Sequence, residues 1–194
     1  EEALINKIES LLVKGIDVLI FEDYNKGVLT ANVIEKVIGL CHKYKVITTV
    51  DPKKDNFFAY KGVTLFKPNL KELVEGTGLE INFKKQPEVF QRAISILEAK
   101  LENKISFITL SENGVFIKNS QEQHHINAHI RNIADVSGAG DTVIAVASLC
   151  LAAEAPLKAI AAVANIAGGL VCEESGVVSI NKEKLLVEVE KLIS

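Results

Sequence analysis

Apolar residues recur along the chain at two spacings, one typical of helices and one of buried strands. Residues 3–13 carry apolar side chains three and four positions apart, which is the spacing of one helix face, and Gly15 follows. Residues 17–21 (DVLIF) form a short apolar run, as expected for a strand buried on both faces. The same alternation predicts helices at 30–44, 70–75 and 87–100, and strands at 45–50, 63–66 and 105–110.

Two of these helices carry end signals. Thr30 is a suitable N-cap for the first, and Gly76 is expected to end the second. After residue 110 the pattern changes: residues 114–118 and 124–129, around a polar tip, predict an antiparallel hairpin. Three further helices are expected, from about residues 139 and 156, and at 182–192.

Strands joined by helical crossovers favour a mainly parallel sheet with helices on both faces. We therefore expect a single α/β domain over residues 1–194.

Composition narrows the class of partner. The net charge of -3 provides no basic field for nucleic acid or an anionic membrane. The longest apolar stretches, 142–153 and 159–172, are shorter than the ~20 residues that span a bilayer. Neither a nucleic-acid partner nor a membrane span is predicted. Three widely spaced cysteines in apolar helical contexts, Cys41, Cys150 and Cys172, are expected to be reduced core residues of a cytoplasmic protein.

The stretch 134–142 (ADVSGAGDT) carries the most informative chemistry. Gly138 and Gly140 flank Ala139 directly before an apolar helix, where small residues and free N–H groups suit a bound anion. Asp141 lies in that first turn, where a carboxylate can orient an alcohol and accept its proton. The alternative is a tight turn followed by an acidic residue that the helix dipole favours.

A second candidate pair follows the third predicted strand. Asn69 and Glu72, in KPNLKE, lie three positions apart and share one helix face. An amide and a carboxylate so placed can hold magnesium waters and ATP phosphates, because Mg²⁺ usually keeps most of its waters. Taken alone, the pair is also explained by helix capping.

Charged residues follow the first two predicted strands as well. Asp23 and Lys26 come after the first strand and Lys53 after the second, where α/β sheets place ligand-binding groups. Asp23 is a candidate substrate contact, and Lys53 a candidate for a substrate phosphate. The alternative for either lysine is a solvated surface position, and Asp51 before Pro52 is also explained by a turn.

The segment DVSGAGD (135–141) resembles the signature of the ribokinase-like (PfkB) carbohydrate kinases. The resemblance implies that Asp141 is the catalytic base and that the backbone of Gly138, Ala139 and Gly140 forms an anion hole. It also implies a ribokinase-like three-layer α/β/α sandwich with a mainly parallel central sheet, and ATP and Mg²⁺ as cofactors.

Other segments resemble the family in the same order along the chain. KPNLKE is similar to its Pro-Asn-x-x-Glu motif, which implies that Asn69 and Glu72 contact ATP and, through water, Mg²⁺. TLSENG (109–114) resembles its nucleotide-side turn, with serine in place of the usual first glycine. The resemblance implies nucleotide contacts from this turn and from a helix position beside the adenine: Thr109, Ser111, Gly114 and Asn165. An Asn at that helix position, among alanines, is equally explained as a packing residue.

The loop 173–179 (EESGVVS) resembles a segment that surrounds a monovalent cation in some relatives, together with Asp135 and Ser137. K⁺ is therefore a candidate ligand of these residues.

Four segments favour the branch of the family that phosphorylates D-glycero-β-D-manno-heptose 7-phosphate for ADP-heptose synthesis. They are the Ser-Glu-x-Gly turn, EDYNKG (22–27), VDPK (50–53) with the aromatic residues after it, and DVSGAGDTVI (135–144). The resemblance implies an ATP-dependent kinase that phosphorylates the anomeric 1-hydroxyl and forms heptose 1,7-bisphosphate, on the route to lipopolysaccharide core. A kinase for another phosphosugar, such as fructose 6-phosphate, and a nucleotide-binding fragment without activity remain alternatives.

The kinase domain of the family is considerably longer than these 194 residues, and the chain begins Glu1-Glu2 and contains no Met. We therefore expect the C-terminal part of a kinase domain, without the N-terminal portion and its lid strands. Such a part is expected to have little activity by itself. For the full-length protein the resemblance implies a homodimer that binds a phosphosugar and ATP.

Overall fold

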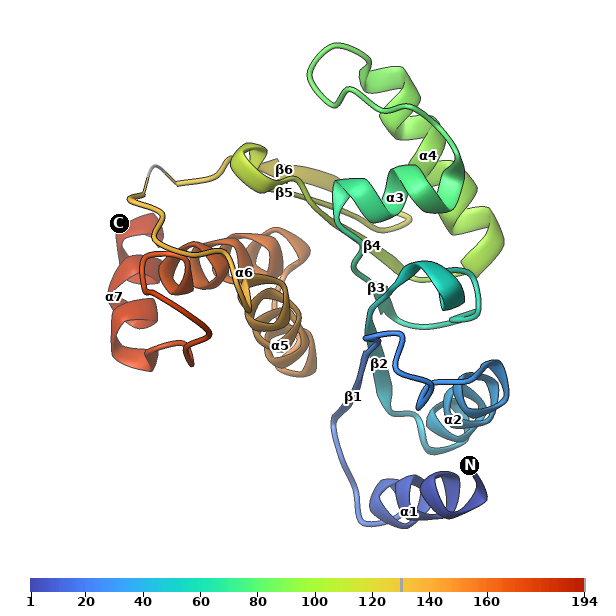
Figure 1. The fold of residues 1–194 in the computed structure, drawn as a ribbon. Coiled ribbons are helices and arrows are strands. Elements are labelled where there is room, and N and C mark those ends of the chain that lie inside the picture. The colour runs from blue at the N-terminus through green and yellow to red at the C-terminus, as the bar shows by residue number, and fades with distance from the viewer. Residues whose placement is uncertain (130, 194) are drawn as a thin grey trace. The chain divides into compact units, whose positions relative to one another are not determined.

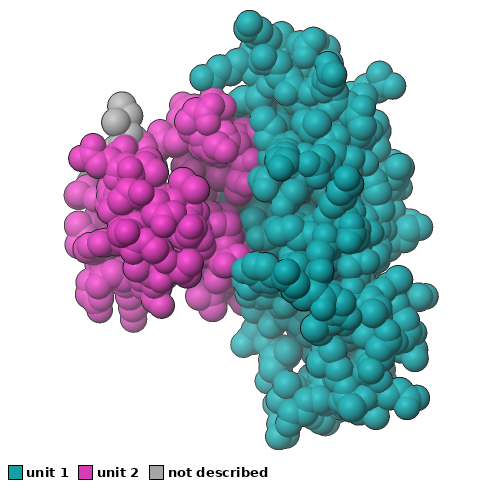
Figure 2. All heavy atoms as spheres, in the orientation of Figure 1, with its two compact units in different colours: residues 1–108 teal, residues 109–194 magenta. Residues whose placement is uncertain are grey.

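The structure, a computed structural model, describes residues 1–129 and 131–193, with side chains described as far as Lys191. The chain divides into two compact units, unit 1 (residues 1–108) and unit 2 (residues 109–194), shown in teal and magenta in Figure 2. This division does not test the expectation of a single domain over residues 1–194, which stays a prediction.

Unit 1 is built on parallel strands that lie side by side in chain order. Val18 lies opposite Ile47 in the first pair, and Leu65 lies opposite Ile105 in the last. Because the strands are parallel, their carboxyl ends share one edge of the sheet. The strands, the last of which runs one residue into unit 2, are β1 (Val18–Glu22), β2 (Ile47–Asp51), β3 (Leu65–Phe66) and β4 (Ile105–Thr109).

The helices of unit 1 that connect these strands lie on one side of them, as Figure 1 shows for α2, α3 and α4. This follows from topology, because right-handed crossovers between parallel strands in chain order place every connection on the same face. The helices are α1 (Glu2–Leu12), α2 (Ala31–Tyr44), the short η1 (Lys54–Asn56), α3 (Leu70–Thr77) and α4 (Pro87–Leu101).

Local sequence signals account for one helix boundary and fail at another. The predicted cap of α2 is confirmed, since the Thr30 side chain accepts a hydrogen bond from the Val33 N–H. The predicted end of α3 at Gly76 is wrong. A Cβ at Gly76 would lie 2.3 Å from the Phe57 ring, so this glycine gives the ring room inside the helix. The helix instead ends before Gly78, whose φ of 69° is the left-handed cap.

Aromatic side chains fill the core of unit 1. Phe57 packs edge-on against Phe66 at 5.2 Å between ring centroids, and Phe21 packs on Tyr60 in the same way at 5.5 Å. Tyr60 and Phe66 are completely buried. Burying a large apolar side chain contributes about 1.5–3 kcal/mol to folding. The aromatic core therefore stabilises the sheet from which the loops at its carboxyl edge extend.

Unit 2 contains the hairpin and the three C-terminal helices. The predicted hairpin is confirmed, with Val115 opposite Ile126 in an antiparallel pair. Helices α5 and α6 pack closely against each other. Gly168 permits this approach, since a Cβ at that position would lie 2.6 Å from a methyl of Val143. The elements are η2 (Ser111–Asn113), β5 (Val115–Lys118), β6 (Gln123–Ile126), α5 (Ala139–Ala152), α6 (Leu157–Val171) and α7 (Lys182–Ile193).

The expected core position of the cysteines is confirmed for Cys41 and Cys172 and not for Cys150. All three are free; Cys41 and Cys172 are buried and Cys150 is partly exposed. Burial raises the pKa of the Cys41 thiol to about 11, so this side chain stays a neutral thiol. Within the part of the chain that the structure describes, every helix is too short or too polar to cross a bilayer.

Candidate active site

Asp23, which follows β1, is held by three donors of unit 1. Its carboxylate accepts hydrogen bonds from the Asn25 N–H at 2.8 Å, from Asn56 Nδ2 at 3.1 Å and from the Tyr60 hydroxyl at 2.8 Å. The residue is only 3% exposed, and such bonds offset the cost of removing a carboxylate from water. Asp23 thereby fixes the loop between β1 and α2, while its contact with a substrate stays a prediction.

Replacing Tyr60 with Phe tests this arrangement. Burial, and then the hydrogen bond to Asp23, raise the pKa of Tyr60, so the hydroxyl remains a donor at neutral pH. Without it, we expect the free energy of unfolding to fall by about 1–3 kcal/mol, because a buried acceptor loses a partner. Urea denaturation measures the loss.

The matched control is Tyr44→Phe, whose hydroxyl donates to Glu9 at 3.1 Å near the surface. We expect it to change the free energy of unfolding by less than about 0.5 kcal/mol. Equal losses in the two variants would contradict the role of Tyr60.

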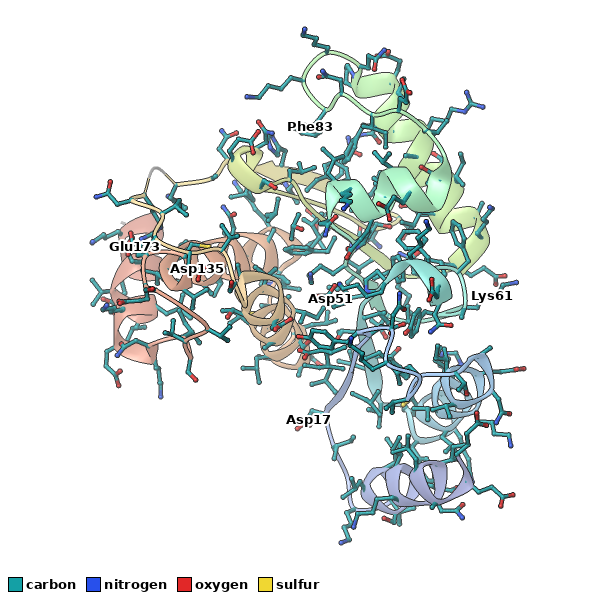
Figure 3. The ribbon with its side chains drawn as sticks, viewed as in Figure 1. Asp17, Asp51, Lys61, Phe83, Asp135 and Glu173 are labelled. Carbon is teal, nitrogen blue, oxygen red and sulfur yellow. The ribbon has the colours of Figure 1, made fainter. Side chains whose placement is uncertain are left out.

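Four charged side chains form an ion-pair cluster across the ends of β2 and β3. Lys53 Nζ lies 2.8 Å from Glu72 Oε1 and 3.5 Å from Asp51 Oδ1, and Lys67 Nζ lies 3.1 Å from Asp51 Oδ2. Burial acts to lower the pKa of Lys53, but the Glu72 hydrogen bond and the Asp51 charge outweigh it and raise that pKa. The cluster brings together a predicted substrate residue, Lys53, and a predicted magnesium residue, Glu72; Figure 3 labels Asp51 among them.

The sequence did not mark Lys67 as a site residue. Its side chain is only 3% exposed, and its charge is paired with Asp51. The sequence did contain a signal for Lys67, which lies directly after the apolar strand β3 and before Pro68. A lysine next to a buried strand is expected to need an acidic partner, because lysines are rarely buried unless they are paired.

Asn69 and Glu72 form a capping box at the start of α3. Asn69 Oδ1 accepts from the Glu72 N–H, and Glu72 Oε2 accepts from the Asn69 N–H, both at 2.8 Å. The capping alternative is therefore realised in the structure. The capping bond does not use up the Glu72 carboxylate, which has about four acceptor positions, and the nucleotide role of the pair stays a prediction.

The donor set at this edge fits one mode of binding Mg²⁺. Glu72 carries a carboxylate whose oxygens already pair with Lys53 and with the Asn69 N–H, so it suits contact with Mg²⁺ through water. Mg²⁺ commonly binds through one or two carboxylates together with phosphates and water. Within residues 1–129 and 131–193, no cluster of three or more His, Cys, Asp or Glu residues could hold a metal by itself.

Residues 135–141 form a tight turn that leads into α5. Gly138 precedes the helix with a φ of 77°, a conformation that favours glycine. Asp135 Oδ1 accepts hydrogen bonds from the Ser137 N–H at 2.9 Å and the Ser137 hydroxyl at 2.8 Å. The backbone bond first, and then the hydroxyl, hold the pKa of Asp135 below its usual range. The turn brings the predicted anion hole and Asp141, in the first turn of α5, to one helix N-terminus.

The predicted nucleotide-side turn is closed by its own backbone. The Leu110 N–H donates to the Gly114 carbonyl at 2.8 Å, and the Gly114 N–H donates to the Ser111 carbonyl at 3.0 Å. Ser111 has a φ of 53°, in the left-handed region. This explains why glycine suits the position, since an L-residue there costs about 1–2 kcal/mol.

Asn165 on α6 is used in packing. Its Nδ2 donates to the Asn127 carbonyl at 2.9 Å and so joins α6 to the segment that follows β6. This hydrogen bond agrees with a structural role for Asn165, and a contact with adenine stays a prediction.

A family model described as pfkB family carbohydrate kinase matches residues 2–184. The chain belongs to the pfkB family of carbohydrate kinases. Among curated relatives, the bifunctional protein HldE of Desulfatibacillum aliphaticivorans is 38% identical over 175 residues, which cover 90% of this chain and 35% of that protein. HldE of Wolinella succinogenes is 38% identical over 176 residues, which cover 91% of this chain and 36% of that protein. The chain thus spans about a third of the length of these relatives.

Solved structures show the same fold. Phosphofructokinase-2 from Escherichia coli in complex with potassium has a TM-score of 0.85 at 18% identity, covering 98% of this chain and 62% of its own. Arabidopsis thaliana ribokinase complexed with ribose and ATP has a TM-score of 0.79 at 16% identity, and the match covers 98% of this chain and 59% of the ribokinase chain. The predicted ribokinase-like α/β fold of this pfkB chain is confirmed.

The predicted site residues of this pfkB chain fall into sets within each unit. Unit 1 gathers charged groups at the carboxyl ends of β1, β2 and β3. Unit 2 carries three separate predicted features: the turn before α5, the turn after β4, and Asn165 on α6. The catalytic and binding roles of these residues stay predictions.

Proposed function

We propose that this chain is part of an ATP-dependent sugar kinase that phosphorylates the anomeric 1-hydroxyl of heptose 7-phosphate to give heptose 1,7-bisphosphate. The observation that carries the proposal is the 38% identity to a bifunctional HldE protein over 90% of the chain. The heptose substrate is favoured over other phosphosugars by the EDYNKG, VDPK and Ser-Glu-x-Gly segments.

In this reaction Asp141 orients the sugar hydroxyl and accepts its proton. The hydroxyl oxygen forms a bond to the γ-phosphorus, and the bond between that phosphorus and the leaving ADP oxygen breaks. The backbone N–H groups of Gly138, Ala139 and Gly140 donate to the phosphoryl oxygens as charge develops. The Ala139 N–H donates to the Val136 carbonyl at 3.3 Å in the structure, so it exchanges this partner for the phosphoryl oxygen. Their place at the start of α5, behind a left-handed Gly138, supports this assignment.

Nucleotide contacts are assigned to Asn69 and Glu72 within unit 1. Within unit 2 they are assigned to Thr109, Ser111 and Gly114 of the turn after β4 and to Asn165, the residue proposed to lie beside the adenine. Mg²⁺, bound with ATP, supplies positive charge to the phosphates, and Glu72 and Asn69 are the residues that hold its waters. K⁺ is assigned to the surroundings of Asp135 and Ser137, whose paired hydrogen bonds order the loop.

The sugar phosphate is assigned to Asp23 and Lys53. The side chain of Lys53 is 35% exposed and charged, so its ammonium can reach an anionic substrate. We further propose that the full-length protein is a cytoplasmic homodimer on the route to ADP-heptose, a precursor of lipopolysaccharide core.

The test uses the full-length gene product with ATP and Mg²⁺. Heptose 7-phosphate and fructose 6-phosphate are compared by ADP release, and ³¹P NMR identifies the phosphorylated carbon. We expect kcat/KM for the heptose to be higher by about 100-fold, and the new phosphate to lie on the anomeric carbon. Faster turnover of fructose 6-phosphate would favour the rival kinase.

The same assay separates a kinase from a nucleotide-binding module. ATP binding by calorimetry with no sugar-dependent ADP release would favour the module. Residues 1–194 alone are expected to turn over little sugar, and robust activity of this piece would contradict that expectation.

A further inference from the structure

Arg131 joins three segments of unit 2. Its Nη1 lies 3.0 Å from Glu173 Oε1, on the loop after α6, and its Nη2 lies 2.9 Å from Glu188 Oε2 on α7. The arginine side chain is only 8% exposed. The two ion pairs therefore hold the loop and α7 to the segment that precedes the turn of residues 135–141.

The arginine lies directly on the backbone of α6. A Cβ at Gly169 would lie 2.9 Å from Arg131 Nε and 3.1 Å from its Cδ. The Nε atom is buried and has no hydrogen-bond partner among the described residues. A buried donor without a partner is unfavourable for folding and calls for an explanation.

The loop that Arg131 holds is bonded directly to the predicted anion-hole turn. The Ala134 and Asp135 N–H groups both donate to the Cys172 carbonyl, at 2.8 and 3.2 Å. The Gly176 N–H donates to Asp135 Oδ2 at 3.2 Å. Figure 3 labels Asp135 and Glu173, one on each of these two segments.

The same loop supports Gly138, the glycine directly before α5. A Cβ at Gly138 would lie 3.0 Å from the Val177 Cγ1 methyl. A shift of the loop residues 172–177 would therefore move the backbone that precedes Ala139 and Gly140. The ion pairs of Arg131 thus hold a loop that itself contacts the turn carrying the N–H groups assigned to the anion hole.

We propose that Arg131 is a positioning residue for phosphoryl transfer, which acts by clamping the loop 172–177 and α7 behind the anion-hole turn. The inference rests on the proposed function of that turn. Because the N–H groups of the turn act on charge that develops in the transition state, loss of the clamp lowers kcat and leaves KM for ATP nearly unchanged. A merely structural ion pair would affect stability and leave kcat of the folded protein unchanged.

The first test replaces Arg131 with Ala in the full-length protein. We expect kcat to fall by about 10- to 100-fold, the scale of a displacement near 1 Å, while KM for ATP changes by less than about threefold. The matched control is Lys184→Ala. Its ammonium pairs with Glu174 at 2.9 Å and joins the same loop to α7, but both side chains are more than half exposed. This control is expected to keep the wild-type kcat.

Chemical rescue makes the test specific. Arg131→Ala leaves the carboxylates of Glu173 and Glu188 without their shared cation, and guanidinium ion has the shape of the missing group. We expect millimolar guanidinium chloride to restore part of kcat, and NaCl at equal ionic strength to restore none. An unchanged kcat in folded Arg131→Ala, or an equal fall in Lys184→Ala, would overturn the proposal.

Two further measurements keep the outcome decisive. If Arg131→Ala does not fold, Glu188→Gln removes the charge that pairs with Arg131, and also with Lys191 at 2.7 Å, while the Arg131–Glu173 pair is kept. A kcat equal to wild type then overturns the proposal. Hydrogen exchange of residues 135–141 does not depend on the sugar, and it should be faster in the clamp variant than in wild type. If wild type phosphorylates no sugar, the proposed function fails, and unchanged exchange rejects the clamp separately.

Discussion

Replacing Asp141 with Asn should lower kcat by about 1,000- to 10,000-fold, the full contribution of a general base, while ATP affinity stays close to wild type. The amide keeps the size of the side chain in the first turn of α5 but cannot accept the proton of the sugar hydroxyl. ADP release in the presence of heptose 7-phosphate measures kcat, and calorimetry measures ATP binding, both in the full-length protein.

The control for Asp141→Asn is Glu183→Gln. Glu183 is also an acidic residue in the first turn of a helix of unit 2, so its replacement removes the same charge from a comparable helix dipole. We expect near-normal turnover from this variant. Near-normal turnover in Asp141→Asn would remove the assigned base, and equal losses in both variants would show that helix electrostatics alone had been disturbed.

Gly114→Ala should lower the free energy of unfolding by at least about 4 kcal/mol, which places it among the most disruptive single substitutions. Gly114 has φ 82° and ψ −132°, which an L-residue adopts only under strain. A Cβ there would lie 2.0 Å from the Ile126 carbonyl oxygen and 2.6 Å from the Ala128 nitrogen. Both are backbone atoms, so no rotamer change relieves the clash. Urea and thermal unfolding measure the loss.

Gly176→Ala separates backbone strain from the clash. Gly176 lies in the same unit with a φ of 77°, and no described atom beyond its own chain neighbours lies within 4 Å of the position that its Cβ would take. We expect a loss of about 1–2 kcal/mol from the left-handed backbone alone. A loss from Gly114→Ala no larger than that of the control would refute the clash as its cause.

The elements were predictable because their signals are local. The apolar spacing that predicts α4 and the alternation that predicts the hairpin β5–β6 involve residues a few positions apart. The end of α3 was mispredicted for the opposite reason. A glycine at the end of a helical pattern is a common stop signal, and Gly76 was interpreted as one. In the structure Gly76 lies inside α3, where the absence of a side chain makes room for the Phe57 ring.

The candidate site was predictable where its residues are consecutive. The sequence alone marked the turn from Asp135 to Asp141, because small residues before an apolar helix leave N–H groups free for an anion. It also marked Asn69 and Glu72, which the structure uses as a capping box. It did not mark Lys67, whose ion pair with Asp51 becomes visible only when the strands β2 and β3 are side by side.

The sequence by itself determined the order of elements, the family and the residues proposed for chemistry. Only the tertiary structure decided what holds those residues in place. Tyr60 reaches Asp23 across 37 positions of the chain, and Arg131 reaches Glu188 across 57. Periodicity and turn chemistry act between near neighbours, whereas such partners meet only after the chain has closed long loops and packed its core.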